Sequence, residues 1–272
     1  MAEKATYTHG HHASVLRVHN QRTALNSAAF LLPHLKPHMK ILDIGCGPGT
    51  ITVDLATYVP DGHVTGLEMV GDVLVGARAL AQSRGITNID FTTGDANTLS
   101  FEDNTFDVVF CHQVLQHVGD PVGILKEMRR VCKAGGGIVA ARESDYSVFM
   151  WYPELPGLRR WQELYDQVAR KNGGEPNAGR HLRVWARRAG FEVKDVESTV
   201  SSWCFATPDE VRWWSGAWQE RILQPAFARG AIGNGLATEE ELKGISGVWR
   251  EWGEHGDAFI SIPSAEVVCR KV

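Results

Sequence analysis

The chain has 272 residues, of which 43% are hydrophobic, and a formal charge of −4 at pH 7. This composition is typical of a soluble globule with one elaborated α/β domain, and it gives no reason to expect a nucleic acid or an anionic membrane as partner. No run approaches the roughly 20 apolar residues of a membrane span, no signal-peptide core opens the chain, and the five scattered cysteines favour a reduced, cytoplasmic setting.

The first half of the chain predicts alternating strands and helices. A histidine-rich start leads into a helix expected over about 21–32, which Pro33 and Pro37 stop. Alternation after residue 40 is typical of a mostly parallel sheet. The expected strands are 41–44, 63–67, 88–92, 106–111 and 137–142, and the expected helices are 50–57, 71–83 and 120–133, the last with Asp120 as N-cap and Gly135 as C-cap.

After residue 142 the pattern changes to amphipathic helices and fewer strands. We expect the last two strands to belong to the same sheet, with a helical insertion between them that forms a lid. The expected elements are a helix containing 158–168, a helix over 180–189, extended segments over 191–197 and 199–205, helices opened by capping boxes at Thr207 and Thr238, and a strand over 265–270.

Three alternating glycines end the first predicted strand and lead directly into a helix. Gly45, Gly47 and Gly49 can adopt positive φ and let a ligand approach the backbone. A strand, a glycine turn and a helix N-terminus predict a nucleotide-binding corner. The spacing is not the Gly-x-Gly-x-x-Gly of dinucleotide sites, and Asp43 would repel a phosphate but favour an amine.

Two further acids end the next strands. Glu68 ends the second strand, where a ribose diol needs acceptors, and Asp95 ends the third strand within Gly94-Asp95-Ala96. Asp95 could accept a hydrogen bond from an adenine amino group. A ligand with an amine, a ribose and an adenine but no phosphate fits all three acids, and S-adenosylmethionine is such a ligand. A nicotinamide oxidoreductase and a structural corner without a ligand are the alternatives.

Five sequence blocks follow one another in order: Ile41–Gly49, Gly94–Ala96, Phe106–Phe110, Val114–His117 with Asp120-Pro121, and Glu127–Gly136. Together they resemble the core of the class I S-adenosylmethionine-dependent methyltransferases. The resemblance is strongest to the UbiE-like branch, which is related to ubiquinone and menaquinone biosynthesis. Ala134 departs from the proline usual in that family, and Gly135 to Gly137 can still stop the helix there.

The resemblance implies a cofactor site. The glycine loop would surround the methionine part, Glu68 would take the ribose hydroxyls, Met69 would pack on the adenine and Asp95 would bind its amino group. It also implies an N-terminal segment that folds over the cofactor, with Tyr7 and Arg22 at the methionine end. The expected cofactor-binding residues are Tyr7, Arg22, Asp43, Gly45, Cys46, Gly47, Gly49, Glu68, Met69, Gly94, Asp95, Ala96, His112 and Gln113.

Methyl transfer from a sulfonium depends mainly on positioning, and a general base helps when the acceptor must lose a proton. For each histidine, a hydrogen-bonded structural role is the stronger alternative. Glu143 and Asp145 follow the fifth strand and could also reach an acceptor. The candidate catalytic residues are His9, His112, His117 and Tyr146.

No metal is expected, because His9-Gly-His-His12 has no carboxylate or cysteine beside it and makes a poor zinc site. The cysteines are expected to be inert. All nine tryptophans follow residue 150. Their helical spacing favours core contacts, while their number in the acceptor half favours a flat, apolar or aromatic acceptor.

The sequence thus predicts a Rossmann-like, doubly wound, mostly parallel seven-stranded sheet in one domain over 1–272. Residues 1–40 would form a cap, 41–142 the cofactor-binding core, and 143–272 the acceptor side. The predicted activity is S-adenosylmethionine-dependent methylation of a small organic acceptor of secondary metabolism, with O-methylation preferred to N- or C-methylation. A non-catalytic adenosylmethionine-binding regulator or subunit is the alternative. A monomer or homodimer is expected, without nucleic-acid or membrane partners.

Overall fold

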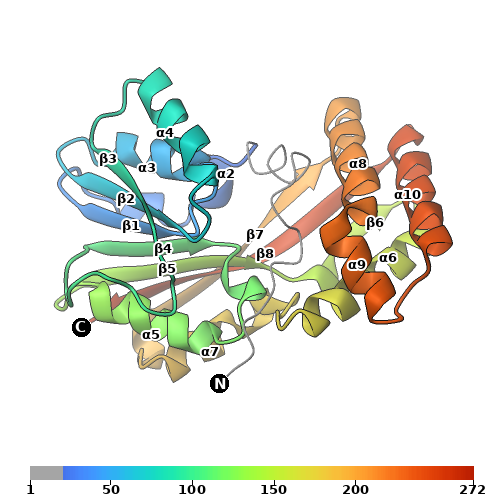
Figure 1. Cartoon of the computed structure of the whole chain (residues 1–272). Coiled ribbons are helices and arrows are strands. Elements are labelled where there is room, and N and C mark those ends of the chain that lie inside the picture. Colours follow the sequence, from blue (N-terminus) through green and yellow to red (C-terminus); the bar gives the residue numbers. More distant parts are fainter. Residues whose placement is uncertain (1–20) are drawn as a thin grey trace.

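The computed structural model describes residues 21–272, which form a mixed eight-stranded sheet with helices on both faces (Figure 1). The strand order is β3-β2-β1-β4-β5-β8-β6, and β7 also pairs with β8. Strands β1 to β5 are parallel, whereas β8 is antiparallel to β5, β6 and β7. The strands are β1 (Lys40–Ile44), β2 (His63–Glu68), β3 (Ile89–Thr93), β4 (Val108–His112), β5 (Gly137–Ser144), β6 (Met150–Tyr152), β7 (Val196–Phe205) and β8 (Phe259–Lys271).

Helices α3 and α4 cover one face of the sheet, and α5 and α7 cover the other (Figure 1). This confirms the predicted doubly wound fold, with the short β6 as an eighth strand. The helices are α2 (Ala24–Ser27), α3 (Thr50–Tyr58), α4 (Val73–Ser83), α5 (Pro121–Val131), α6 (Pro156–Lys171), α7 (Leu182–Arg188), α8 (Pro208–Leu223), α9 (Pro225–Gly233) and α10 (Glu239–Glu254).

Helix capping follows the sequence signals at two of three places. The Asp120 side chain accepts a hydrogen bond from Gly123 N at 2.7 Å and so begins α5, although α5 ends at Val131, short of the predicted Lys133. Thr207 and Glu210 close the capping box of α8. At Thr238 only half of the predicted box forms, because the Glu241 carboxylate bonds Arg160 instead, at 2.7 Å.

The predicted helical insertion between the last two strands is present as α8, α9 and α10. These helices and α6 lie beyond one end of the sheet (Figure 1) and share an aromatic core. The Trp161 ring centroid lies 4.6 Å from that of Trp218 and 4.9 Å from that of Trp249, both edge to face. Edge-to-face aromatic pairs add to the stability gained from burial.

Two sequence predictions about local structure are wrong. The helix expected over 21–32 is reduced to the four residues of α2, followed by a 3₁₀ turn at Leu32–His34, and Leu31 between them is fully buried in the core beside the sheet. The extended segment expected over 191–197 contains a 3₁₀ turn at Val193–Asp195, and β7 starts only afterwards.

Candidate active site

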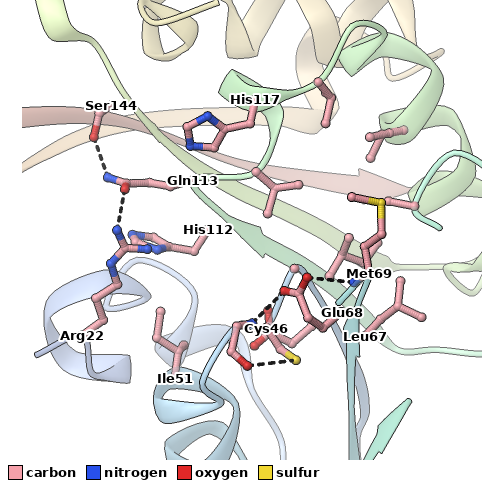
Figure 2. Close-up of a pocket in the computed structure, with 18 of the residues that line it drawn as sticks. Arg22, Cys46, Ile51, Leu67, Glu68, Met69, His112, Gln113, His117 and Ser144 are labelled. Atoms are coloured by element: carbon pink, nitrogen blue, oxygen red, sulfur yellow. Dashed lines mark hydrogen bonds between the residues drawn. The ribbon is translucent and has the colours of Figure 1, made fainter. Parts of the chain in front are cut away.

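A cavity of about 520 Å³ opens at the carboxyl ends of the parallel strands, where ligands bind in open α/β sheets (Figure 2). Gly49 does not line it, and Tyr7 and His9 lie outside the described residues. The predicted site residues that line the cavity are Arg22, Asp43, Gly45, Cys46, Gly47, Glu68, Met69, Gly94, Asp95, Ala96, His112, Gln113, His117 and Tyr146.

The glycine loop has the left-handed backbone that its sequence predicted. The φ angles are +68° at Gly45, +54° at Gly47 and +79° at Gly49. A Cβ at Gly45 would lie 2.5 Å from a methyl carbon of Val114, and one at Gly49 would lie 2.7 Å from the Ala77 Cβ. Gly49 is therefore needed for packing between α3 and α4, whereas Gly45 and Gly47 form the cavity wall.

Glu68 is fixed by the backbone around it. Its Oε2 accepts a hydrogen bond from Gly47 N at 3.1 Å, and its Oε1 accepts from Met69 N at 2.8 Å (Figure 2). The same Oε1 also accepts from Val70 N at 3.2 Å. Asp95 is held in the same way, since its Oδ1 accepts from the backbone and side-chain nitrogens of Asn97 at 2.9 and 2.7 Å. Both carboxylates are thus held in place beside the cavity.

Asp43 lies below the glycine loop and is only 3% exposed. Its Oδ2 accepts a hydrogen bond from Thr52 Oγ1 at 2.7 Å. Burial raises the pKa of this carboxyl to about 7; the Thr52 hydrogen bond opposes the rise and the nearby Glu68 charge adds to it. Asp43 also lines the cavity. A cation bound beside it would therefore stabilise the charged form of its carboxyl group.

A polar chain lies at the opposite end of the cavity from Glu68 (Figure 2). Arg22 Nη2 donates to Gln113 Oε1 at 2.9 Å, and Gln113 Nε2 donates to Ser144 Oγ at 2.6 Å. Gln113 has a φ of +54°, which is uncommon outside glycine and typical of functional turns. The Arg22 guanidinium also lies 5.4 Å from the Trp203 ring centroid. A guanidinium is thus held at this end of the cavity.

Nε2 of His112 is engaged by a neighbouring arginine. That nitrogen lies 3.0 Å from Arg142 Nη1, and a guanidinium only donates, so Nε2 is the acceptor of this hydrogen bond. Arg142 is itself fully buried and forms an ion pair with Glu266 at 3.3 Å. The His112 ring is consequently part of a buried polar network between β4, β5 and β8.

His117 and Tyr146 face the cavity but are poor bases. Burial, together with the positive charges of Arg22 and Arg221, lowers the pKa of His117 to about 3. Burial raises the pKa of Tyr146 above its ordinary value, and a hydrogen bond with Tyr165 opposes the rise. The Tyr146 ring stacks on Tyr165 at 4.0 Å and on Phe149 at 4.5 Å. At neutral pH His117 is therefore uncharged, and Tyr146 keeps its proton.

The expectation that Glu143 and Asp145 reach an acceptor is wrong. Glu143 is fully buried, and its carboxylate accepts hydrogen bonds from the amides of Val114 at 2.8 Å and Leu115 at 2.7 Å. Asp145 pairs with Arg180, with Oδ2 2.5 Å from Nε. Neither residue lines the cavity. Both carboxylates stabilise loops instead.

The second half of the chain completes the wall with residues that the sequence did not single out. All nine tryptophans lie within the described residues, but only Trp203 and Trp214 line the cavity. Most of the tryptophans therefore pack in the core of the insertion. Their number is thus not evidence for an aromatic acceptor, which corrects that part of the sequence prediction. In this half, the lining residues missed from the sequence are Ser144, Phe149, Trp203, Trp214, Arg221 and Ile262.

Arg221 is the most informative of these residues. It is 4% exposed, and its guanidinium carbon lies 4.6 Å from the Trp218 ring centroid. The sequence held a signal for it, because Arg221 follows Trp214 by seven residues and Trp218 by three, and so falls on the apolar face of its helix. A charged residue on such a face indicates a site or a buried ion pair.

Residues 21–272 contain no cluster of three His, Cys, Asp or Glu side chains able to hold a metal ion. In the same part of the chain, no helix is both long and apolar enough to cross a membrane. The His9-Gly-His-His12 segment lies outside the described residues.

Residues 35–210 match a methyltransferase domain family. The chain is 34% identical to an uncharacterised methyltransferase of Schizosaccharomyces pombe, over 97% of this chain and 96% of that protein. It is 32% identical to the "Probable methyltransferase ltbC" of Aspergillus luteorubrus, over 97% of both chains. A demethylmenaquinone methyltransferase of Bacillus cytotoxicus is 35% identical over 48% of this chain and 53% of its own.

Solved structures show the same fold. A SAM-dependent methyltransferase from Aquifex aeolicus has a TM-score of 0.51 at 17% identity, covering 67% of this chain and 89% of that one. Phosphoethanolamine N-methyltransferase 2 of Haemonchus contortus, in complex with S-adenosyl-L-methionine, has a TM-score of 0.54 at 18% identity, covering 88% of this chain and 50% of that one. The chain therefore belongs to the class I S-adenosylmethionine-dependent methyltransferases, in their UbiE-like branch, and is an enzyme that uses S-adenosyl-L-methionine as its cofactor.

Proposed function

We propose that the enzyme transfers a methyl group to an oxygen atom of a small, flat and largely apolar acceptor. The observation that carries this proposal is the make-up of the cavity wall beyond the cofactor residues, which contains Tyr146, Phe149, Trp214 and Ile262. Such a wall suits a flat apolar molecule. Among the described residues from 144 onward that line the cavity, none is acidic. Beyond the three cofactor acids, the one described acid in the lining is Asp120, whose Oδ1 accepts a hydrogen bond from Gly123 N at the start of α5.

The residues of the cavity fit the cofactor. Asp43 would face the ammonium group, and Arg22 the carboxylate of the methionine part. Glu68 would bind the ribose hydroxyls, and Asp95 the adenine amino group. When bound, the cofactor supplies a methyl group that its sulfonium already activates. The contribution of the chain is to hold donor and acceptor in line and to exclude water, which can supply on the order of 7–11 kcal/mol.

We further propose that residues 1–272 act as one domain. Strand β8 from the end of the chain pairs with β5 of the cofactor-binding half over eight positions, from Gly137 with Lys271 to Ser144 with Ser264. The cavity also draws its lining from both halves. Cofactor and acceptor surfaces would then form only when the whole chain folds.

The function is tested with methyl-labelled S-adenosylmethionine and pairs of acceptors. The two members of a pair share one aromatic ring system and carry either a phenolic hydroxyl or an amine. We expect label in the phenol as a methyl ether and none in the amine. Transfer to the amine alone would overturn the oxygen assignment. Cofactor binding with no transfer to any acceptor in a broad extract would contradict catalysis itself.

Asp95→Ala should weaken adenosylhomocysteine binding by about 1–3 kcal/mol, because a charge-assisted hydrogen bond to the adenine amino group is lost. Isothermal titration measures this loss. Asp90→Ala in β3, the strand that precedes Asp95, is the matched control, since the Asp90 side chain is 78% exposed and its one side-chain bond among the described contacts is to His63. Equal affinity in both variants would remove Asp95 from the adenine site.

The pH dependence of cofactor binding should reflect the protonation of the Asp43 carboxyl group. Its pKa of about 7 in the free protein means that part of the population must lose a proton before it can face an ammonium group. Affinity should therefore rise with pH up to about 7, by at most about tenfold per pH unit, and level off above it. Titrations at several pH values should show this rise, and Asp43→Asn should bind weakly without it. A rise that persists in Asp43→Asn would assign it to another group.

A further inference from the structure

The loop after β4 forms one wall of the cavity. Gln113, Val114, His117 and Val118 all line it, and Gln113 begins the loop with a left-handed φ of +54°. Gln113 also belongs to the polar chain at the end opposite Glu68, where the proposed function places the methionine part of the cofactor (Figure 2). The conformation of this loop therefore decides the shape of the methionine end of the cavity.

The Glu143 carboxylate, which does not line the cavity, holds three consecutive amides of this loop. Its Oε1 accepts from Val114 N at 2.8 Å and from Leu115 N at 2.7 Å, and its Oε2 accepts from Gln116 N at 3.3 Å. These amides directly follow the turn at Gln113, where a positive φ is uncommon for a residue other than glycine and needs support from its surroundings. The carboxylate therefore fixes the loop next to its strained residue.

The burial of Glu143 is costly, and its hydrogen bonds restrict the backbone. Glu143 is fully buried, and burial raises the pKa of its carboxyl group to about 7, a rise that the three amide hydrogen bonds and the Arg22 charge oppose. Burying a carboxyl group costs free energy, which its hydrogen bonds partly offset. In addition, the three bonds specify a single arrangement of the backbone, because a satisfied buried polar network rigidifies its surroundings.

The far end of the loop is attached independently of Glu143. The carbonyl oxygen of Gln116 accepts a hydrogen bond from Glu175 N at 2.9 Å, and Leu115 is fully buried in the core beside the sheet. Loss of the Glu143 carboxylate should therefore relax the turn at Gln113, while the loop stays attached and the protein stays folded.

Resting on the cofactor placement in the proposed function, we propose that Glu143 is a positioning residue for the methionine part of the cofactor. It acts through the loop after β4, which it holds in the conformation that presents Gln113 to that part. Glu143 itself touches neither cofactor nor acceptor. Because the role concerns one part of the cofactor, its loss should weaken a ligand that has this part and hardly affect a ligand that lacks it.

The test compares two ligands by isothermal titration, adenosylhomocysteine and 5′-methylthioadenosine, which lacks the amino-acid part. Glu143→Leu removes the acceptor oxygens at similar side-chain volume. We expect it to weaken adenosylhomocysteine by about tenfold or more and 5′-methylthioadenosine by less than about threefold. Glu143→Gln keeps an oxygen for the two shorter bonds and should recover most of the lost affinity. In amide hydrogen exchange, Val114 and Leu115 should be protected in the wild type and in Glu143→Gln but not in Glu143→Leu.

Asp145→Leu is the matched control, because it removes another buried carboxylate, which pairs with Arg180 and does not line the cavity. It should leave both affinities unchanged. If Glu143→Leu does not fold, Glu143→Asp decides, since its shorter side chain should lose amide bonds and show the same selective loss. Equal losses for the two ligands, unchanged affinity for adenosylhomocysteine, or no recovery in Glu143→Gln would overturn the proposal. Failure of the wild type to bind adenosylhomocysteine would instead contradict the proposed function.

Discussion

Gly47→Val should abolish adenosylhomocysteine binding in a protein that still folds. Gly47 has a φ of +54° and lines the cavity, and its N–H donates to Glu68. A β-branched residue disfavours this backbone by about 1–3 kcal/mol, and its side chain would occupy the approach to the loop. Because a shift of the strained loop would also move the backbone N–H that Glu68 accepts from, we expect affinity to fall by at least about a hundredfold, measured by isothermal titration.

The matched control is Gly85→Val. Gly85 has a φ of +67° at the end of α4, and a Cβ there would meet nothing within 4 Å. This variant carries similar backbone strain away from the cavity and should bind adenosylhomocysteine normally. Thermal unfolding of both variants separates loss of fold from loss of the site. Near-normal affinity in folded Gly47→Val would place the ligand elsewhere.

Glu266→Gln should lower the free energy of unfolding by about 3–5 kcal/mol, because it leaves the Arg142 cation buried without its counter-charge. Arg142 is 1% exposed and Glu266 5%, and Glu266 also accepts from Thr199 Oγ1 at 2.7 Å. Burial lowers the pKa of Arg142 to about 10, with the Glu266 charge opposing the shift. Urea denaturation followed by tryptophan fluorescence measures the loss.

Replacing both partners with methionine should recover most of that stability, since neither charge then remains buried. Lys243→Gln is the surface control, because its pair with Glu239 on α10 is solvent-exposed and should not change the urea midpoint. A Glu266→Gln variant as stable as the wild type would show that the pair contributes nothing to stability and that the network around His112 does not need it.

The sheet and the cofactor end of the cavity could be predicted because their signals are local. Gly45 and Gly47 encode their own backbone conformation, and the strand before them places Asp43. The chain order of strands and helices then brings the ends of β1 and β2 to one edge. These features need no knowledge of distant contacts.

The acceptor end could not be predicted because it depends on contacts between distant segments. Glu143 looked like a site residue because it ends a strand, yet it binds the amides of a loop about 30 residues earlier. Arg221 reaches the cavity only because the insertion packs beyond the end of the sheet. Strand β6 spans three residues and, among the described strands, pairs only with β8, so it leaves no periodic pattern. Helix α9 begins at Pro225, directly after α8. From the sequence alone, that proline indicates the end of a helix and gives no sign that another helix begins there.

A crystal structure of the protein with adenosylhomocysteine tests the central claim most directly. The account predicts the nucleoside between Glu68 and Asp95, the amino-acid part between Asp43 and Arg22, and the sulfur atom turned toward the wall that contains Tyr146 and Arg221. A ligand bound in the reverse direction, or outside the cavity beside the glycine loop, would contradict it.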